Sequence, residues 1–140
     1  MKKLVLFSFI LLAALSCKND EVTSNEVNFN ITLKGTNEVP ANASAATGTF
    51  VAAYNKDTKI LKYTITYAGI TPTAWHIHKG AATATGAVVF NFGTTFSTPY
   101  VNQTVALTTD QETDLLAGNY YVNIHSALFA AGEIRGQLVK

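Results

Sequence analysis

The stretch Ala74–Gly80 reads Ala-Trp-His-Ile-His-Lys-Gly and holds two of the chain's three histidines beside its only tryptophan. Successive side chains of a β-strand point to opposite faces, so Trp75 and Ile77 share one face. His76 and His78 then share the other face. We therefore expect a strand with one face directed at the core and an opposite face that carries two imidazoles.

Two later stretches show the same division between an apolar and a polar face. In residues 120–126 the polar positions include Asn123 and the third histidine, His125. Near the C-terminus the polar positions include Glu133 and Arg135. We expect these strands to lie on one side of a β domain, with their polar positions together on a solvent-facing surface.

Short alternating or apolar segments, separated by turn residues, extend along most of the chain. Strands are expected at 27–34, 48–54, 61–67, 74–78, 88–92, 100–107, 120–126 and 133–139. The strand at 88–92 is expected to be well buried. One short helix is expected near 110–116, after a capping box formed by Thr109 and Glu112. About eight strands at this spacing are typical of an all-β antiparallel sandwich or barrel.

Composition excludes several functional classes. Hydrophobic residues make up 48% of the 140 residues and charged residues 14%, which is unlike a disordered chain. The formal net charge of +1 gives no electrostatic basis for binding nucleic acid. The sequence also contains no Walker loop, Rossmann fingerprint or Gly-x-Ser-x-Gly elbow.

The first 16 residues have the features of a lipoprotein signal peptide. Lys2 and Lys3 precede the apolar run Leu4–Leu15, which is shorter than the roughly 20 residues that span a bilayer. The following cysteine, Cys17, completes a segment that resembles a bacterial lipobox, although Ala14 stands where leucine is usual. We expect cleavage before Cys17 and lipidation of its thiol; an ordinary signal peptide with an incidental cysteine is the alternative.

This interpretation divides the chain into a signal peptide at 1–16, a lipidated N-terminus and tether at 17–26, and a folded domain at 27–140. The acidic pair Asp20 and Glu21 resembles the surface-export signal of some Gram-negative lipoproteins, and a plain polar tether is the alternative. We expect an outer-membrane lipoprotein of the cell envelope, periplasmic or surface-exposed, held to the membrane by its lipid.

The three histidines form a candidate metal site. His76 and His78 stand two residues apart on one strand face, about 7 Å between Cα atoms, so both imidazoles can reach one ion. A His-x-His pair with a distant third histidine, here His125, is a recurrent arrangement for zinc or copper. Glu133 or Asn123 could supply a fourth ligand or a hydrogen bond to a ligand.

The alternative for the same residues is a structural network of polar side chains. Asn123 and Arg135 would then hydrogen-bond neighbouring strands and loops, and the histidines would be ordinary polar strand residues. No nucleophile–base pair and no acidic dyad is evident in the sequence, so an enzymatic role is not favoured.

Six segments in order carry a resemblance to a known family. They are Leu33–Pro40, Ala46–Gly48, Leu61–Ile65, His76–Gly80, Leu116–Ser126 and Gly132–Leu138. As a set they resemble the CHRD domain, named for the developmental antagonist chordin and found alone in many secreted bacterial proteins. The resemblance implies an immunoglobulin-like β-sandwich or barrel over 27–140 and no established biochemical activity. The loop 81–86 departs from the family because it has fewer glycines and no proline.

A weaker likeness is to copper/zinc superoxide dismutase, another β-sandwich with a His-x-His strand and a later histidine. The copper of that enzyme has more histidine ligands than this chain contains, and its disulfide has no counterpart here. We therefore expect a lipid-anchored, non-enzymatic binding or structural module of the CHRD family. A copper- or zinc-binding protein is the alternative, and an adhesion domain for an unknown protein or matrix partner is a further one.

Overall fold

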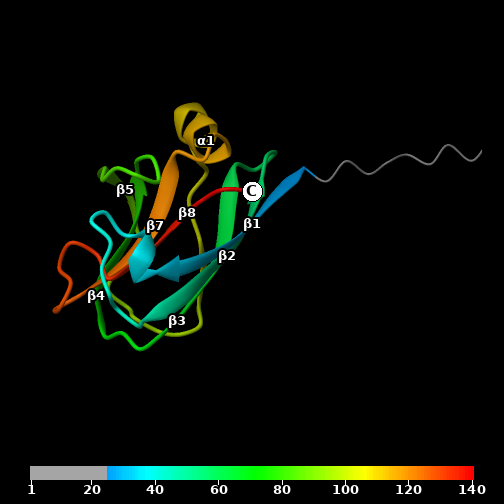
Figure 1. Cartoon of the computed structure of the whole chain (residues 1–140). Helices are drawn as coiled ribbons and strands as arrows, with labels where there is room; N and C mark the ends of the chain where they lie inside the picture. Colours follow the sequence, from blue (N-terminus) through cyan, green and yellow to red (C-terminus); the bar gives the residue numbers. More distant parts are fainter. Residues whose placement is uncertain (1–24) are drawn as a thin grey trace, which may run out of the picture.

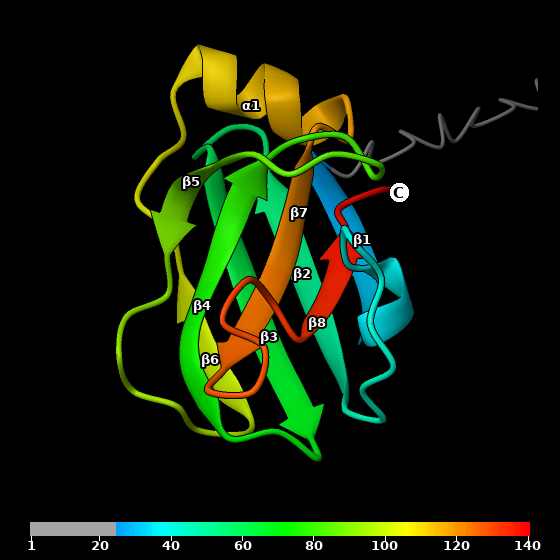
Figure 2. The same ribbon diagram turned by 60° about the vertical axis from the view of Figure 1, so that its left-hand side comes forward.

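The computed structural model describes residues 25–140; the expected signal peptide, lipobox and Cys17 lie outside the described residues. The strands are β1 (Glu26–Lys34), β2 (Thr47–Asn55), β3 (Ile60–Ala68), β4 (Pro72–Lys79), β5 (Ala87–Asn91), β6 (Tyr100–Gln103), β7 (Tyr120–Ser126) and β8 (Ile134–Gln137). They form one antiparallel sheet in the order β5-β4-β7-β8-β1-β2-β3-β6, which curls into a half-barrel (Figures 1 and 2). The expected antiparallel all-β fold is confirmed.

The apolar positions of the strands pack together inside this curl. Trp75 on β4 is fully buried, and its ring centroid lies 4.8 Å from that of Tyr100 and 5.3 Å from that of Phe96. Its indole N–H donates to the Gly93 carbonyl at 3.0 Å, so burial leaves that polar group satisfied. The core position expected for Trp75 is confirmed.

Two expectations about the strands are wrong. The segment at 88–92 is not well buried as a whole: Val88 is 49% exposed, because β5 is an edge strand that pairs only with β4. The strand from Tyr100 ends at Gln103 rather than at residue 107. Immediately after it, the Thr104 N–H still donates to the Leu61 carbonyl at 3.0 Å, but the Leu61 N–H donates to the Thr104 hydroxyl at 3.1 Å, where a continuing ladder would use the Thr104 carbonyl.

The sheet changes from one half of the curl to the other between β8 and β1. These two strands pair in register only at Lys34 and Arg135. Gly136 follows at once, and a Cβ there would lie 2.8 Å from the Thr32 carbonyl oxygen and 2.8 Å from a methyl of Leu33. Glycine is therefore required for this close approach, after which the two strands separate.

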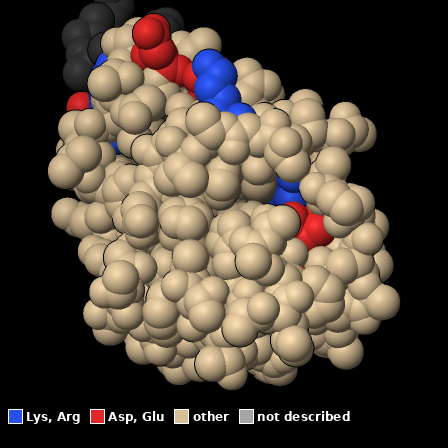
Figure 3. Space-filling view, turned by 90° about the vertical axis from the view of Figure 1, so that its left-hand side faces the viewer, with Lys and Arg blue, Asp and Glu red and all other residues tan. Residues whose placement is uncertain are grey.

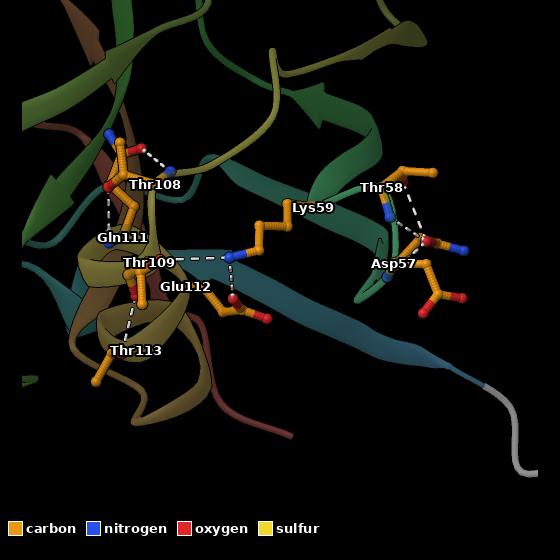
Figure 4. A network of polar contacts seen from close by, with 9 residues as sticks. Asp57, Thr58, Lys59, Thr108, Thr109, Gln111, Glu112 and Thr113 are labelled. Atoms are coloured by element: carbon orange, nitrogen blue, oxygen red, sulfur yellow. Dashed lines mark hydrogen bonds and ion pairs between the residues drawn. The ribbon is translucent and has the colours of Figure 1, made fainter.

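A short 3-10 turn η1 (Gly35–Asn37) follows β1, and the helix α1 (Thr109–Leu116) lies across one end of the sheet (Figure 2). The expected helix is confirmed, but its capping box is one residue earlier than expected. The Thr108 hydroxyl accepts from the Gln111 N–H at 3.2 Å, and the Gln111 side chain accepts from the Thr108 N–H at 2.9 Å (Figure 4). Glu112 instead forms an ion pair with Lys59 at 3.1 Å. Within residues 25–140, no helix has the length and apolar character needed to cross a membrane.

Thr108→Ala should lower the free energy of unfolding by about 1 kcal/mol, because the first turn of α1 loses its capping hydroxyl. Thr109→Ala is the matched control, since the Thr109 hydroxyl receives only a long bond from Lys59 at 3.4 Å. We expect a change of less than about 0.5 kcal/mol for the control. Urea unfolding followed by tryptophan fluorescence compares them, and equal losses would argue against Thr108 as the cap.

Candidate metal centre

The outward-facing positions of β4, β7 and β8 lie side by side as the sequence predicts. One row across the three strands is His78, Tyr121 and Gln137. The next row is His76, Asn123 and Arg135. In a third row, Ala74 on β4 pairs with His125 on β7. We call these residues, with Glu133 directly before β8, the polar array. It brings together the candidate site residues at the centre of one sheet face.

The expectation that this face is open to solvent is wrong. Arg135 is 1% exposed, Asn123 2% and Glu133 5%. Two loops, residues 38–46 and 80–86, cover them. The first loop is held by Asn42, whose amide donates to the Glu133 carbonyl at 3.1 Å, and by Ser44, whose hydroxyl donates to the Glu133 carboxylate at 2.7 Å.

The three imidazoles converge at one edge of the polar array. Each of His76, His78 and His125 offers a ring nitrogen, and these three atoms lie within 4.8 Å of one another. The shortest separation joins His76 Nδ1 to His125 Nε2 at 3.2 Å. Tetrahedral zinc with Zn–N bonds of about 2.0–2.1 Å places its ligand nitrogens roughly 3.3 Å apart. The histidines therefore need only small ring movements to share one ion.

Backbone carbonyls fix the orientation and tautomer of two rings. His78 Nδ1 lies 2.9 Å from the Gly86 carbonyl, and His125 Nδ1 lies 3.0 Å from the Ala130 carbonyl. A carbonyl only accepts, so both Nδ1 atoms carry the proton and both Nε2 atoms keep a lone pair. His78 Nε2 is buried without a hydrogen-bond partner. This is the arrangement usual for histidines that ligate a metal through Nε2.

Electrostatics also favours the neutral imidazoles that a metal needs. Burial lowers the pKa of His76, and the neighbouring His125 and His78 lower it further. Burial likewise lowers the pKa of His125, against its hydrogen bond to Ala130, which raises it. Both rings are therefore held in the form that can donate a lone pair.

The two residues considered as a fourth ligand lie outside the histidine cluster. Among the described residues, the ligand atoms that meet within 4.8 Å come from the three histidines, and no carboxylate joins them. The Glu133 carboxylate accepts from the Ser44 hydroxyl, and Asn123 lies between His76 and Arg135 in the array. The protein ligands therefore leave a coordination position open for water or another molecule.

The polar array continues from the histidines through Tyr121. The His78 ring stacks on the Tyr121 ring, with 4.9 Å between centroids and an interplanar angle of 4°, and Arg135 Cζ lies 3.4 Å from the Tyr121 ring centroid. One Arg135 nitrogen donates to the Ala81 and Ala84 carbonyls at 2.8 and 2.9 Å. The loop 80–86 is thus held by the same side chains that form the array.

Glu38 is the charged residue of this region that the sequence pattern did not single out. It lies in the loop after η1 and is 7% exposed. Burial raises its pKa to about 7, against the positive charge of Arg135 and hydrogen bonds from Val39 and Asn123, which lower it. The signal available in the sequence was an acidic residue in Asn37-Glu38-Val39-Pro40, but only the fold places it beside Arg135.

Glu38→Gln should stabilise the protein above pH 7 and remove a pH dependence. The folded protein retains a proton on Glu38 between pH 4.5 and about 7 that the unfolded chain has lost, so stability falls as the pH rises through this window. A shift of that size corresponds to roughly 3 kcal/mol, which solvent screening reduces to about 1–2 kcal/mol. Urea unfolding at pH 5 and pH 8 measures this contribution. If the free energy of unfolding falls by the same amount between the two pH values in Glu38→Gln and in the wild type, Glu38 is not the titrating group.

The surface around the site carries little charge. Few acidic or basic side chains appear on the face that includes β4 and β5, and one acidic and one basic group lie recessed within it (Figure 3).

Fold and site together define a class of protein, an antiparallel β half-barrel with a covered polar array on one sheet face. The family model of the CHRD domain matches residues 29–138, and the chain belongs to this family. Comparisons with curated proteins and with solved structures each found no match.

Proposed function

We propose that this CHRD-domain protein binds one transition-metal ion, copper or zinc, through His76, His78 and His125. The observation that supports the proposal is the convergence of three ring nitrogens within 4.8 Å, with two of the rings oriented by backbone carbonyls. Neutral imidazole is a ligand that suits both metals. The binding role fits a module that carries or sequesters an ion at the cell envelope.

The geometry favours binding over catalysis. At three protein ligands with an open position, metal-assisted hydrolysis is commonly helped by a nearby general acid or base. The Glu133 carboxylate accepts from Ser44 at 2.7 Å, and among the described residues no carboxylate joins the cluster of three histidines. The polar array therefore supplies hydrogen bonds that hold loops in place, and the metal site itself is a binding site.

A direct titration tests the metal proposal. The Cys17→Ser chain is the right material, because it removes the only thiol that could bind copper or zinc elsewhere. Equilibrium dialysis should give one ion per chain, and Co²⁺ loaded in place of zinc should show the strong visible absorption of a four-coordinate site. Uptake well below one ion per chain for both copper and zinc would reject the proposal.

We also propose that the protein is anchored in the cell envelope through a lipid on Cys17. This part rests on the lipobox-like segment that ends the apolar run at residues 4–15. The wild-type protein should incorporate labelled fatty acid and sediment with membranes. Cys17→Ser should do neither, and membrane association that survives this change would reject the anchor.

A further inference from the structure

A pocket that does not include the histidines lies where β1 and β8 separate. It has a volume of about 760 Å³. Arg135 and Gln137 line it from β8, Asn30 and Thr32 from β1, and Glu38 from the loop after η1. Exposed residues of the loop 80–86 form part of its rim.

Three buried polar atoms of the lining residues have no hydrogen-bond partner. They are Arg135 Nη1, Glu38 Oε1 and Gln137 Oε1. Polar groups buried in native proteins are nearly always hydrogen-bonded, so unsatisfied atoms on three neighbouring side chains call for an explanation. Arg135 and Glu38 are each less than a tenth exposed. The other polar atom of the Gln137 side chain, Nε2, is hydrogen-bonded.

Other polar atoms of Arg135 and Gln137 already form hydrogen bonds, and these bonds determine whether each unpartnered atom is a donor or an acceptor. Arg135 uses its other terminal nitrogen for the Ala81 and Ala84 carbonyls. Gln137 donates from Nε2 to the Gly80 and Gly118 carbonyls at 2.9 and 2.7 Å, so its Oε1 must be an acceptor. Glu38 Oε1 is the second acceptor when the carboxyl is ionised, above its pKa of about 7, and Arg135 Nη1 is a donor.

We propose that this pocket binds a neutral primary carboxamide, such as the side-chain amide of asparagine or glutamine, through Arg135, Glu38 and Gln137. The carboxamide oxygen accepts from Arg135 Nη1. Its two N–H hydrogens are donated to the oxygens of Glu38 and Gln137. One acceptor and two donors on the ligand thus match one donor and two acceptors on the protein.

Other small polar groups match this set less well. A carboxylate brings no hydrogen for either oxygen, and an ammonium or guanidinium group offers Arg135 no acceptor and repels its charge. A hydroxyl brings a single hydrogen for two acceptors. The pairing of an acidic with a basic residue also favours a ligand group without net charge. Arg135, Glu38 and Gln137 all line the pocket, but the three atoms themselves are buried, so the proposal requires the exposed rim at Ala82 and Thr83 to yield to the ligand.

Three probes with one carbon skeleton test the proposal on the full-length Cys17→Ser chain at about pH 8.5, where Glu38 is ionised: propionamide, propionate and propylammonium. The readout is the NMR signals of the Arg135 guanidinium and the Gln137 side-chain amide. We expect saturable shifts with propionamide at roughly millimolar affinity, as befits so small a ligand, and none with the two ions. Propionate binding as well as propionamide, or no shift with propionamide up to about 100 mM, would overturn the proposal.

A rim variant separates binding in the pocket from weak adsorption elsewhere. Ala82 is exposed and lines the pocket, so Ala82→Trp should obstruct the mouth without disturbing the core. We expect affinity for propionamide to fall at least about tenfold. Ala127→Trp is the matched control, since Ala127 is also exposed but lines a different pocket. Equal affinity in both variants would place the amide outside this pocket and reject the site.

Discussion

His78→Ala is expected to weaken zinc or copper binding by about 100-fold or more. The reason is that it removes one of three converging ring nitrogens, and loss of a ligand should exceed the 10–100-fold usual for a residue that only orients a ligand. His78 is the sharpest choice of the three because its Nε2 is buried without a partner, while its Nδ1 proton is held by Gly86.

Glu133→Gln is the matched control for this prediction. Glu133 also belongs to the polar array, but its carboxylate accepts from Ser44 and takes no part in the histidine cluster. Gln keeps an oxygen that can accept the same bond, so metal affinity should stay within about threefold. Competition with a coloured chelator measures both variants. Equal losses would make Glu133 a ligand, and undiminished binding by His78→Ala would reject the site.

The division of the chain into apolar and polar strand faces could be predicted because it is local. Side chains two residues apart share a face whatever the rest of the fold does. The burial of Trp75 and Ile77 and the alignment of His76 with Asn123 and Arg135 followed from that period. The meeting of the three histidines also followed, once β4 and β7 were taken as neighbours.

What covers the polar array could not be predicted from periodicity. The loops 38–46 and 80–86 have no repeating pattern, and their positions depend on hydrogen bonds to residues far along the chain. Asn42, for example, donates to the Glu133 carbonyl across 91 positions. A face that the pattern indicates as solvent-facing is therefore buried, and Glu38 becomes part of it.

The helix cap shows a different limit. Thr108 with Gln111 and Thr109 with Glu112 both satisfy the sequence pattern of a capping box. The backbone decides between them: Thr108 is extended, with φ −67° and ψ 165°, so its hydroxyl can face the first N–H groups of α1. Pattern alone leaves such a choice uncertain by one residue.

Arg135→Lys should lower the free energy of unfolding by about 2–4 kcal/mol, although it keeps the positive charge. Arg135 is almost fully buried, donates to two carbonyls of the loop 80–86 and stacks on Tyr121. Lysine has a compact ammonium in place of a planar fork, so it cannot keep both carbonyl bonds and the stack. A buried charge with fewer partners also costs more than the same charge in water.

The matched control is a lysine that already forms an ion pair near the surface. Lys79 contacts Asp114 at 2.6 Å, with its side chain 56% exposed, so Lys79→Ala should cost less than about 1 kcal/mol. Urea unfolding followed through the buried Trp75 compares the two, and hydrogen exchange of residues 80–86 locates the loss. We expect faster exchange in this loop for Arg135→Lys alone. A change below about 1 kcal/mol with unaltered exchange would show that the loop is held by other contacts, because Arg135 could not then be its principal anchor.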